Sequence, residues 1–320
     1  MQARGAALAP GILFDCDMGR DIDTALALST LCGLGRGRLI AVGVSNSSLD
    51  AAAFCDAVTR FYGIGGSLPV GLAENGHKLE NPRMLKAALD LRNPDGQPTF
   101  RTTVRSIIDT GDPPVVFRNA LLTQQDMQGI VVMAGPATNL ARMLSLGGAR
   151  EIIASKVRLL VMGAGAFESS SVDPRIGIDT ASARKVLADW PSPIVAVGVE
   201  AGKAVAYSSA VFESDFGQAT NHPVGVAYRT YREGQADPQI SAQSVLAALY
   251  AADSAADHFK LSQSGSIEVS SDGRTVFRAS SSGKHRHLLM DTAQKDAIAK
   301  AFVTLATTRP AGGRGGPARD

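Results

Sequence analysis

The sequence predicts one α/β domain built on a mostly parallel β-sheet that is flanked by helices. Short apolar runs alternate along the chain with Ala- and Leu-rich stretches of helical period, which is typical of parallel strands joined by crossover helices. The chain has 320 residues, of which 45% are hydrophobic and 19% are charged. This length allows a substantial buried core, and this composition is too apolar for a disordered chain.

The candidate strands are apolar runs of five to ten residues. They are "GILFD", "LIAVGVS", "GIVVMAG", "VRLLVMGAG" and "PIVAVGVEAG". Helices are expected in "DTALALSTLCGL" and "SLDAAAFCDAVTRFYG" after the first two runs, in "ATNLARMLSL" after the third, and in "DTASARKVLADW" before the fifth. In the second of these helices Ser48 or Asp50 can cap the start, and Gly63 can end it.

The last third of the chain has a less regular pattern. A helix is expected in "AQSVLAALYAAD", and a C-terminal β-hairpin in "SIEVSSDGRTVFRA" with its turn at Asp272-Gly273. A closing helix in "TAQKDAIAKAFVTLATT" completes a domain over residues 11–308. Residues 1–10 and the Gly-, Arg- and Pro-rich residues 309–320 are expected to be flexible or disordered tails.

Charge and cysteine content predict a soluble cytoplasmic protein. The net charge of +2 gives no strong attraction to nucleic acid or to an anionic membrane, so neither is expected as a partner. Cys16, Cys32 and Cys55 are odd in number and without paired spacing, which fits a reducing compartment better than a disulfide framework. The sequence lacks the apolar core of a secretory signal and any window of about 18 apolar residues that could span a membrane.

Polar residues follow the first three apolar runs. Asp15 and Asp17 end the first run, Asn46 ends the second, and Thr138 and Asn139 follow the third. The carboxyl ends of parallel strands meet at one edge of a sheet, where the following loops and helix N-termini point. We therefore expect these side chains to converge on one ligand site.

Four aspartates crowd the turn after the first strand. Asp15, Asp17, Asp21 and Asp23 lie within nine positions, and their mutual repulsion predicts a positive partner. A hard divalent cation such as Ca²⁺ or Mg²⁺ binds carboxylate and carbonyl oxygens of this kind. Alternatively, Asp21 and Asp23 cap the following helix and favour its dipole, while Arg20 neutralises a neighbour.

Several motifs resemble one known family. "FDCDMGRDIDTALAL" is similar to the N-terminal signature of the inosine–uridine preferring nucleoside hydrolases, in their longer bacterial variant. Four further segments resemble this family over about residues 11 to 305: "LIAVGVSNSS", "VMAGPATNLARML", "LLVMGAGA" with "VDPRIGIDTASARKVL", and "GRTVFRASSSGKHRHL". The resemblance implies a single α/β domain with the nucleoside hydrolase fold.

The resemblance also implies an activity and a set of site residues. It implies hydrolysis of the N-glycosidic bond of ribonucleosides, one bound Ca²⁺ and a homo-oligomer. Asp15, Asp17 and the backbone carbonyl of Thr138 would hold the metal, and Asp17 would be the base that activates water. Asp23 and Asn46 would contact the ribose.

The sequence departs from the family pattern at three places. Thr24 and Ser244 stand where the family has carboxylate ligands, so the implied calcium site has a reduced charge and fewer ligands. The family's ribose-clamping Glu-Phe-Asn is replaced by residues 173–175, "DPR". Asp173 keeps a carboxylate facing the substrate, whereas Arg175 replaces a neutral amide with a fixed cation.

These departures leave the identity of the positive partner open. Arg175, Arg20 or Lys203 could pair with Asp15 and Asp17 in a pocket without metal. Arg175 in the pocket would also suit an anionic ligand through bidentate contact. Alternatively, Arg175 points into solvent from a loop.

Four functional interpretations follow from these residues. The chain is either a nucleoside hydrolase with Asp17 as base, or a catalytically degenerate, metal-free relative that binds a sugar-like ligand or a partner subunit. The haloacid-dehalogenase-like phosphatases share an Asp-x-Asp motif after a first strand, but their later acidic pair is missing here. The "GAG" at 163–165 lacks the third glycine and the downstream acid of a dinucleotide-binding loop.

The histidines offer no clear catalytic acid. His285 and His287 are expected to be structural residues on one side of a strand. His77, His222 and His258 are expected in loops or at the surface.

Overall fold

The computed structural model describes residues 9–35, 38–79, 83–206, 221–233, 240–257, 259–290 and 292–307. The expected N-terminal tail falls mostly, and the C-terminal tail wholly, outside these residues, so the proposed domain boundaries remain predictions.

Within the described residues, ten strands form one sheet in the order β3-β2-β1-β4-β5-β6-β10-β8-β9, and β7 pairs with β10. The strands are β1 (Gly11–Cys16), β2 (Leu39–Asn46), β3 (Val70–His77), β4 (Gly129–Ala134), β5 (Val157–Met162), β6 (Ile194–Ala196), β7 (Lys260–Leu261), β8 (Gly265–Val269), β9 (Thr275–Ala279) and β10 (His285–Leu289). Neighbours from β3 to β10 along this order pair in parallel, whereas β7, β8 and β9 pair antiparallel. The predicted α/β class with a mostly parallel sheet is confirmed.

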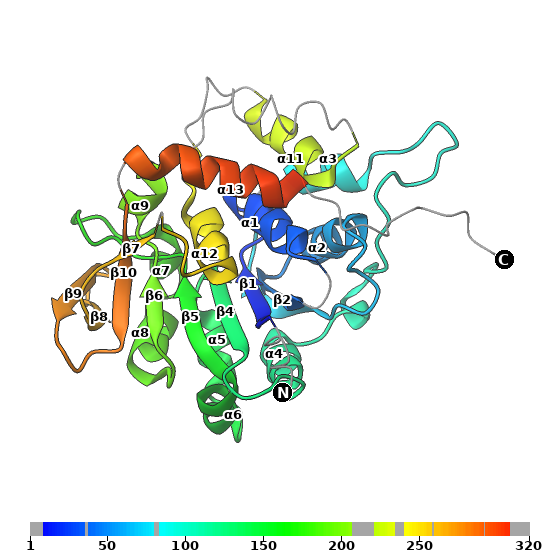
Figure 1. Ribbon diagram of the computed structural model, residues 1–320. Coiled ribbons are helices and arrows are strands. Elements are labelled where there is room, and N and C mark those ends of the chain that lie inside the picture. Colours follow the sequence, from blue (N-terminus) through cyan, green and yellow to red (C-terminus); the bar gives the residue numbers. More distant parts are fainter. Residues whose placement is uncertain are drawn as a thin grey trace, which may run out of the picture.

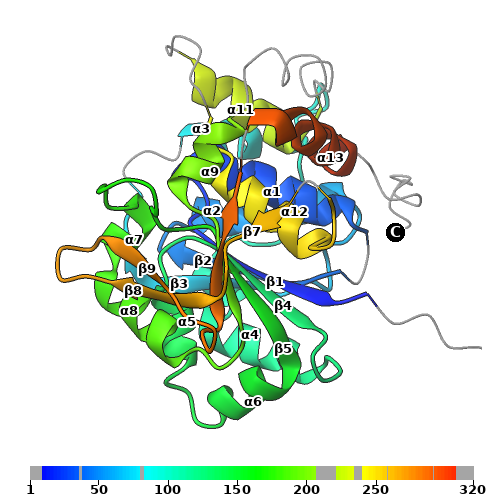
Figure 2. The same cartoon turned by 60° about the vertical axis from the view of Figure 1, so that its left-hand side comes forward.

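Helices cover both faces of the sheet (Figure 1, Figure 2). One face carries α1 (Ile22–Gly33), α2 (Leu49–Phe61), α3 (Arg83–Leu89), α9 (Val199–Ala204), α11 (Pro223–Arg232), α12 (Gln243–Ala252) and α13 (Lys295–Thr307). The other face carries α4 (Pro113–Leu122), α5 (Thr138–Met143), α6 (Ala149–Lys156) and α8 (Thr180–Asp189). The short segments η1 (Ile107–Asp109), α7 (Pro174–Ile178) and η2 (Thr292–Gln294) complete the described helices.

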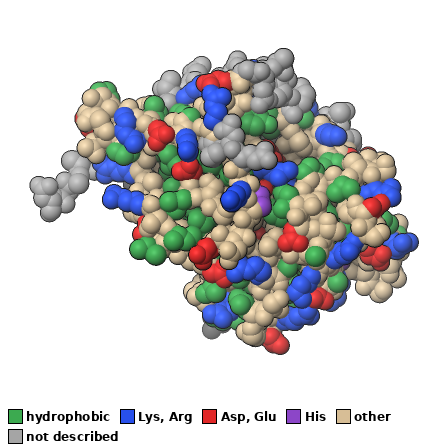
Figure 3. Space-filling view, turned by 180° about the vertical axis from the view of Figure 1, so that it is seen from behind, with side chains coloured by type: hydrophobic (Ala, Val, Ile, Leu, Met, Phe, Trp, Pro, Cys, Tyr) green, Lys and Arg blue, Asp and Glu red, His purple; other side chains and the backbone are tan. Residues whose placement is uncertain are grey.

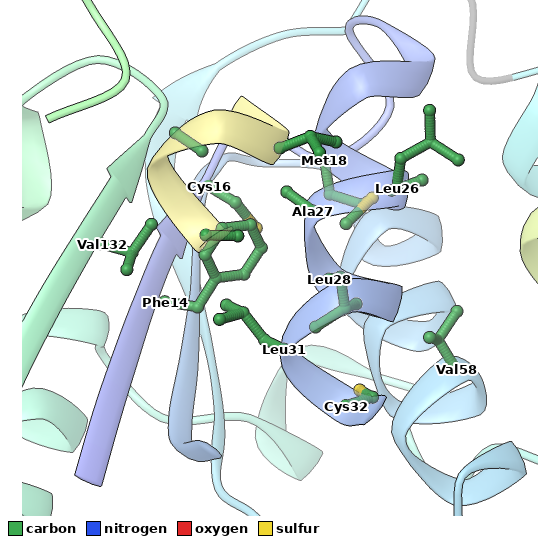
Figure 4. Packing of buried hydrophobic residues seen from close by; sticks show 14 of the residues in the cluster. Phe14, Cys16, Met18, Leu26, Ala27, Leu28, Leu31, Cys32, Val58 and Val132 are labelled. Atoms are coloured by element: carbon green, nitrogen blue, oxygen red, sulfur yellow. The ribbon is translucent and has the colours of Figure 1, made fainter. Parts of the chain in front are cut away.

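The central strands are apolar on both sides because both faces are covered. In β1, Ile12 and Phe14 belong to the core beneath α1 and α12, whereas Leu13 belongs to the core beneath α4 and α5. Figure 4 shows Phe14 of β1 packed against Leu31 of α1, with Val132 of β4 beside it. The alternation of period two explains why the sequence reads as uninterrupted apolar runs.

Helix α1 lies inside the molecule rather than at its surface. It packs against α12 and α13, and nearly all of its residues are buried. Gly33 permits this packing, because a Cβ at that position would lie 1.8 Å from the carbonyl oxygen of Leu305 in α13. The turn between β1 and α1, which carries Asp17 and Asp21, therefore lies between the sheet and a second layer of helices.

Two sequence expectations for local structure are confirmed and one strand was missed. The expected hairpin is β8–β9, with Gly273 in the left-handed region at φ +85°. Ser48 occupies the N-cap position of α2, although its side chain makes no capping hydrogen bond. The sequence did not predict β3, because only its first four residues are buried and its second half is polar.

The described helices and one face of the surface show how length, polarity and charge are distributed. Among the described residues, the helices are too short or too polar to cross a bilayer. On the face seen in Figure 3, Lys and Arg side chains are interspersed with Asp and Glu. This face therefore lacks the single-sign patch that a nucleic acid backbone attracts.

Candidate active site

The predicted convergence at the carboxyl ends of the strands is present. Asp15 and Asp17 lie at the end of β1, and both are buried. Asn139 at the start of α5 donates from Nδ2 to Oδ1 of Asp15 over 2.8 Å. Gly135, after β4, lies so close that a Cβ there would stand 2.8 Å from the backbone nitrogen of Asp17. The loop after β4 is thus pressed directly against the aspartate turn.

Asp17 is held by residues from two other strands. Asn46, the last residue of β2, donates from Nδ2 to Oδ1 of Asp17 over 2.8 Å and to the carbonyl of Met18 over 3.0 Å. His77, the last residue of β3, places Nε2 2.9 Å from Oδ1 and 3.1 Å from Oδ2 of Asp17. Arg20 lies further away, with Nη1 3.9 Å from Oδ2. Asp17 therefore sits among polar and cationic groups that suit a carboxylate.

Asp15 is in a different electrostatic state. Complete burial raises its pKa from 3.8 to about 8, the charge of Asp17 adds to this rise, and the hydrogen bond from Asn139 opposes it. Its Oδ2 has no hydrogen-bond partner in the described part of the chain. At neutral pH Asp15 is thus mostly protonated.

Asp21 and Asp23 cap two different helices. Asp21 is the N-cap of α1 and accepts from the backbone nitrogen of Thr24 over 3.2 Å. Asp23 instead reaches the N-terminus of α12, where it accepts from the backbone nitrogens of Ser244 over 2.6 Å and Val245 over 3.2 Å. Both oxygens of Asp23 are thereby engaged, so a ribose contact by this residue remains a proposal.

Arg175 is buried between these acids, and the expectation that it points into solvent is wrong. Only 7% of the residue is exposed. It donates to Oε1 of Gln243 over 2.5 Å and to Oγ of Ser244 over 2.9 Å, and its Nη2 lies 3.4 Å from Asp21 and 3.5 Å from Asp23. Burial raises the pKa of Asp23 to about 6, helped by Asp21 and opposed by Arg175. Arg175 is the internal cation of this site.

Of the three cations that could pair with Asp15 and Asp17, Arg20 forms an ion pair with Asp17, whereas Arg175 does not pair with either. The ion pairs of Arg175 go to Asp21 and Asp23 rather than to Asp15 and Asp17. Nearby acids outweigh the cost of burial and raise the pKa of Arg175, so it stays charged.

Asp173 supports Arg175 rather than facing an open space. It caps α7, and its Oδ1 accepts from the backbone nitrogen of Arg175 over 2.8 Å. Its Oδ2 accepts from Nε2 of Gln243 over 2.9 Å, and Gln243 also donates to the carbonyl of Val197 over 2.8 Å. Gln243, which the sequence did not indicate as functional, connects α7, β6 and α12.

The expectation for His77 is wrong, His222 lies in the loop before α11 as expected, and His258 falls outside the described residues. His77 contacts Asp17 at the site instead of lying at the surface. His222 is buried and caps α11 through Nδ1, so its Nε2 carries the proton and donates to Tyr62 over 2.9 Å. His285 accepts from the backbone of β8, and His287 stacks on Phe167, so both have the structural role that was expected. His258 is not among the described residues.

Thr138 is oriented by a residue that the sequence did not indicate. It is the first residue of α5, and its Oγ1 donates to Oδ2 of Asp179 over 2.7 Å. Asp179 also caps α8 by accepting from Ser182 over 3.0 Å. The side chain of Thr138 is thus fixed by α8, while a role of its carbonyl as a metal ligand remains a proposal.

A cavity of about 470 Å³ opens beside this network. Its charged lining consists of Arg20, Asp21, Asp23, Arg175 and Lys203. Among the described residues that line it, the aspartates of β1 are absent. This volume is in the range of small-molecule sites, which span about 300–1,000 Å³.

Sequence comparison identifies the family of this chain. A sequence model described as "Inosine-uridine preferring nucleoside hydrolase" matches residues 12–304. The chain belongs to this family of nucleoside hydrolases. A search of curated proteins gave no match.

Solved structures show the same nucleoside hydrolase fold at low sequence identity. A plant nucleoside hydrolase is 20% identical with a TM-score of 0.68, and an inosine-uridine preferring nucleoside hydrolase from Bacillus anthracis is 17% identical with a TM-score of 0.68. A purine-preferring ribonucleoside hydrolase from Gardnerella vaginalis is 16% identical with a TM-score of 0.67. Each comparison covers 93% of this chain and 99% of the other.

Nucleoside hydrolases typically depend on a metal, often Ca²⁺, but the residues of this site do not fit one. Calcium requires about six to eight oxygen ligands. Within the described residues, no three His, Cys, Asp or Glu side chains are grouped to hold a metal ion. The oxygens of Asp17 face Asn46 and His77, and Ser244 accepts a hydrogen bond from Arg175. Thr24 gives its hydroxyl proton to Asp21.

Calcium is therefore expected to leave the stability of the protein unchanged. A ligand that binds only the folded state adds about 2.7 kcal/mol when its concentration is about 100-fold above its Kd, which is readily measured as a rise in Tm. We expect no saturable rise on titration with CaCl₂ beyond that given by KCl at equal ionic strength. A saturable rise in Tm that is specific to Ca²⁺ would show that the site does bind this metal.

Proposed function

We propose that this nucleoside hydrolase-like chain cleaves the N-glycosidic bond of a ribonucleoside or related N-glycoside with Asp17 as the base. The observation that carries the proposal is the placement of the Asp17 carboxylate at the carboxyl end of β1, between Asn46 and His77. Family membership supports the reaction class.

In this proposal water attacks the anomeric carbon while Asp17 takes its proton. The C–O bond forms as the C–N bond breaks, the departing base takes a proton from bulk water, and Asp17 then returns the proton it accepted to the hydroxide that remains. Hydrolysis of this kind passes through a cation-like sugar, which a single carboxylate in a desolvated site stabilises. Asn46 and His77 hold that carboxylate in place, and we propose Asn46, Asp23, Asp173 and Arg175 as the residues around the sugar.

The alternative proposal is a catalytically degenerate relative that binds a sugar-like ligand or a partner subunit. Two observations favour it. The carboxylates of Asp23 and Asp173 are engaged by α12, α7 and Gln243. Asp17 is only 1% exposed. A protein that binds a ligand without turnover does not need Asp23 or Asp173 to leave these internal hydrogen bonds.

Substitution of the proposed base separates these alternatives. Asp17→Asn is expected to lower the hydrolysis of a cleaved ribonucleoside by at least about 100-fold, because general bases contribute roughly 10²–10⁴-fold. His77→Gln is expected to lower it less, by about tenfold, through misplacement of Asp17. The exposed Asp90→Asn is a matched control that should keep full turnover.

Turnover and binding are measured on the same preparations. Release of free base from inosine and uridine reports turnover, and calorimetry reports binding. Unchanged turnover in Asp17→Asn would rule out this base. Saturable binding without any base release in the unsubstituted protein would favour the degenerate alternative.

We also propose a homo-oligomer in the cytoplasm. The oligomer rests on the family resemblance, and the location is supported by Cys16, Cys32 and Cys55, which are buried free thiols. Light scattering of the purified chain measures the oligomeric state directly.

A further inference from the structure

The charges that line the cavity fall into two groups. Asp21 and Asp23 share one cation, Arg175, and Asp23 also accepts from the N-terminus of α12. Arg20 and Lys203 line the same cavity. The charged lining therefore has three cations against two carboxylates, and its balance is positive by one charge.

Arg20 and Lys203 are available to a ligand. Both side chains are exposed, and the ion pair of Arg20 in the described part of the chain is a long one, 3.9 Å to Asp17, which leaves its other nitrogens for a ligand. Within the described residues no ion pair of Lys203 is present, and the hydroxyl-bearing Ser171 and Ser241 line the same space. Cations and hydroxyl groups together form charge-assisted hydrogen bonds with phosphate or carboxylate oxygens.

The rest of the cavity suits an uncharged ring. Val172, Pro174, Val199 and Ile240 contribute apolar wall. A pocket with an apolar wall and a few polar groups orients a small molecule that is apolar at one end and polar at the other. A nucleobase and an anionic sugar substituent meet both conditions.

We propose that the ligand of this cavity is an N-glycoside whose sugar carries an anionic group, a phosphate or a carboxylate, held by Arg20 and Lys203. The N-glycoside part rests on the proposed function, whereas the anionic part rests on the cavity charges. Arg175, which the sequence offered as the anion-binding residue, is committed to Asp21, Asp23, Gln243 and Ser244 and does not take this role.

Calorimetry on the full chain tests the proposal. The ligands are inosine, inosine 5′-monophosphate, an inosine analogue with a 5′-carboxylate, and inorganic phosphate. We expect at least one anionic nucleoside to bind about tenfold or more tightly than inosine, because a charge-assisted contact contributes about 1.5–3 kcal/mol. The two anionic ligands distinguish phosphate from carboxylate, and the preference should shrink as salt is added.

Charge-neutral variants locate the contact. Arg20→Gln and Lys203→Gln should each reduce affinity for the preferred anionic ligand by about three- to tenfold while changing inosine affinity less. Lys300→Gln, which removes one exposed charge from α13, is the matched control and should change neither affinity.

Three results would overturn the proposal. They are equal affinity for inosine and both anionic forms, an unchanged preference in both Arg20→Gln and Lys203→Gln, or binding of inorganic phosphate without any nucleoside binding. Because the readout is affinity, failure of hydrolysis alone would reject Asp17 as base and leave this inference standing.

Discussion

Replacing Arg175 with methionine is expected to lower the free energy of unfolding by about 3–5 kcal/mol, the usual cost of removing one partner from a buried ion pair. Methionine fills much of the volume but leaves Asp21 and Asp23 without their cation. It also removes the donors to Gln243 and Ser244. Urea unfolding followed by circular dichroism measures the loss.

A surface arginine supplies the control for this experiment. Arg278 pairs with Glu268 at 3.4 Å, but the two side chains are 67% and 59% exposed. Arg278→Met should therefore cost less than about 1 kcal/mol. Equal losses in Arg175→Met and Arg278→Met would show that Arg175 is not the internal counter-charge.

A second substitution tests whether charge is the cause. Asp23→Asn in the Arg175→Met background removes one of the uncompensated buried charges. We expect the double variant to recover part of the lost stability, because contacting residues have non-additive effects. If the losses add instead, packing rather than charge explains the effect of Arg175→Met.

The fold was predictable where the sequence pattern is local. Apolar runs that alternate with helical stretches define β1, β2, β4, β5 and β6, because both faces of the central sheet are covered. Strand β3 was missed because it leaves the core halfway, at Glu74 and Asn75, and its polar end resembles a loop.

The site was predictable only as far as the strands position it. Asp15, Asp17 and Asn46 come together because parallel strands end at one edge. The same rule would have placed His77 there, had β3 been recognised.

Partners from distant helices could not be predicted in this way. Asp23 bonds to the backbone of Ser244, 221 positions along the chain, because α12 packs on α1 with its N-terminus above Asp23. The sequence near Asp23 does not indicate its contact with Ser244, and it does not indicate that Arg175 is buried beside it. The carboxylates and the candidate cations Arg20 and Arg175 were therefore predictable, but the acids that Arg175 pairs with were not.

The electrostatics of Asp15 lead to the other large effect, a loss of stability as the pH rises. Burial raises the pKa of Asp15 from 3.8 to about 8. Between pH 3.8 and about pH 8, the folded protein therefore holds a proton on Asp15 that the unfolded chain has released. A raised carboxyl pKa stabilises the folded protein fully below pH 3.8, and this contribution declines as pH rises through about 8. Each unit of pH in this window costs up to about 1.4 kcal/mol for one proton.

Asp15→Asn isolates this contribution. The amide has no proton to lose, and its oxygen can still accept from Asn139. We expect the variant to gain stability relative to the unsubstituted protein as pH rises from about 4 to about 8, with a slope of up to about 1.4 kcal/mol per pH unit. Urea unfolding at several pH values measures the difference between the two proteins.

Comparing the two proteins removes the other titrating groups. Asp23 contributes with the same sign up to its raised pKa of about 6, while the lowered pKa values of Asp56 and Asp179 act oppositely and only at acid pH. These three residues are present in both proteins, so their contributions cancel when the stability of Asp15→Asn is compared with that of the unsubstituted protein. The exposed Asp90→Asn should give a difference that does not vary with pH. A flat difference for Asp15→Asn as well would mean that Asp15 is ionised in the folded protein and that its burial does not raise its pKa.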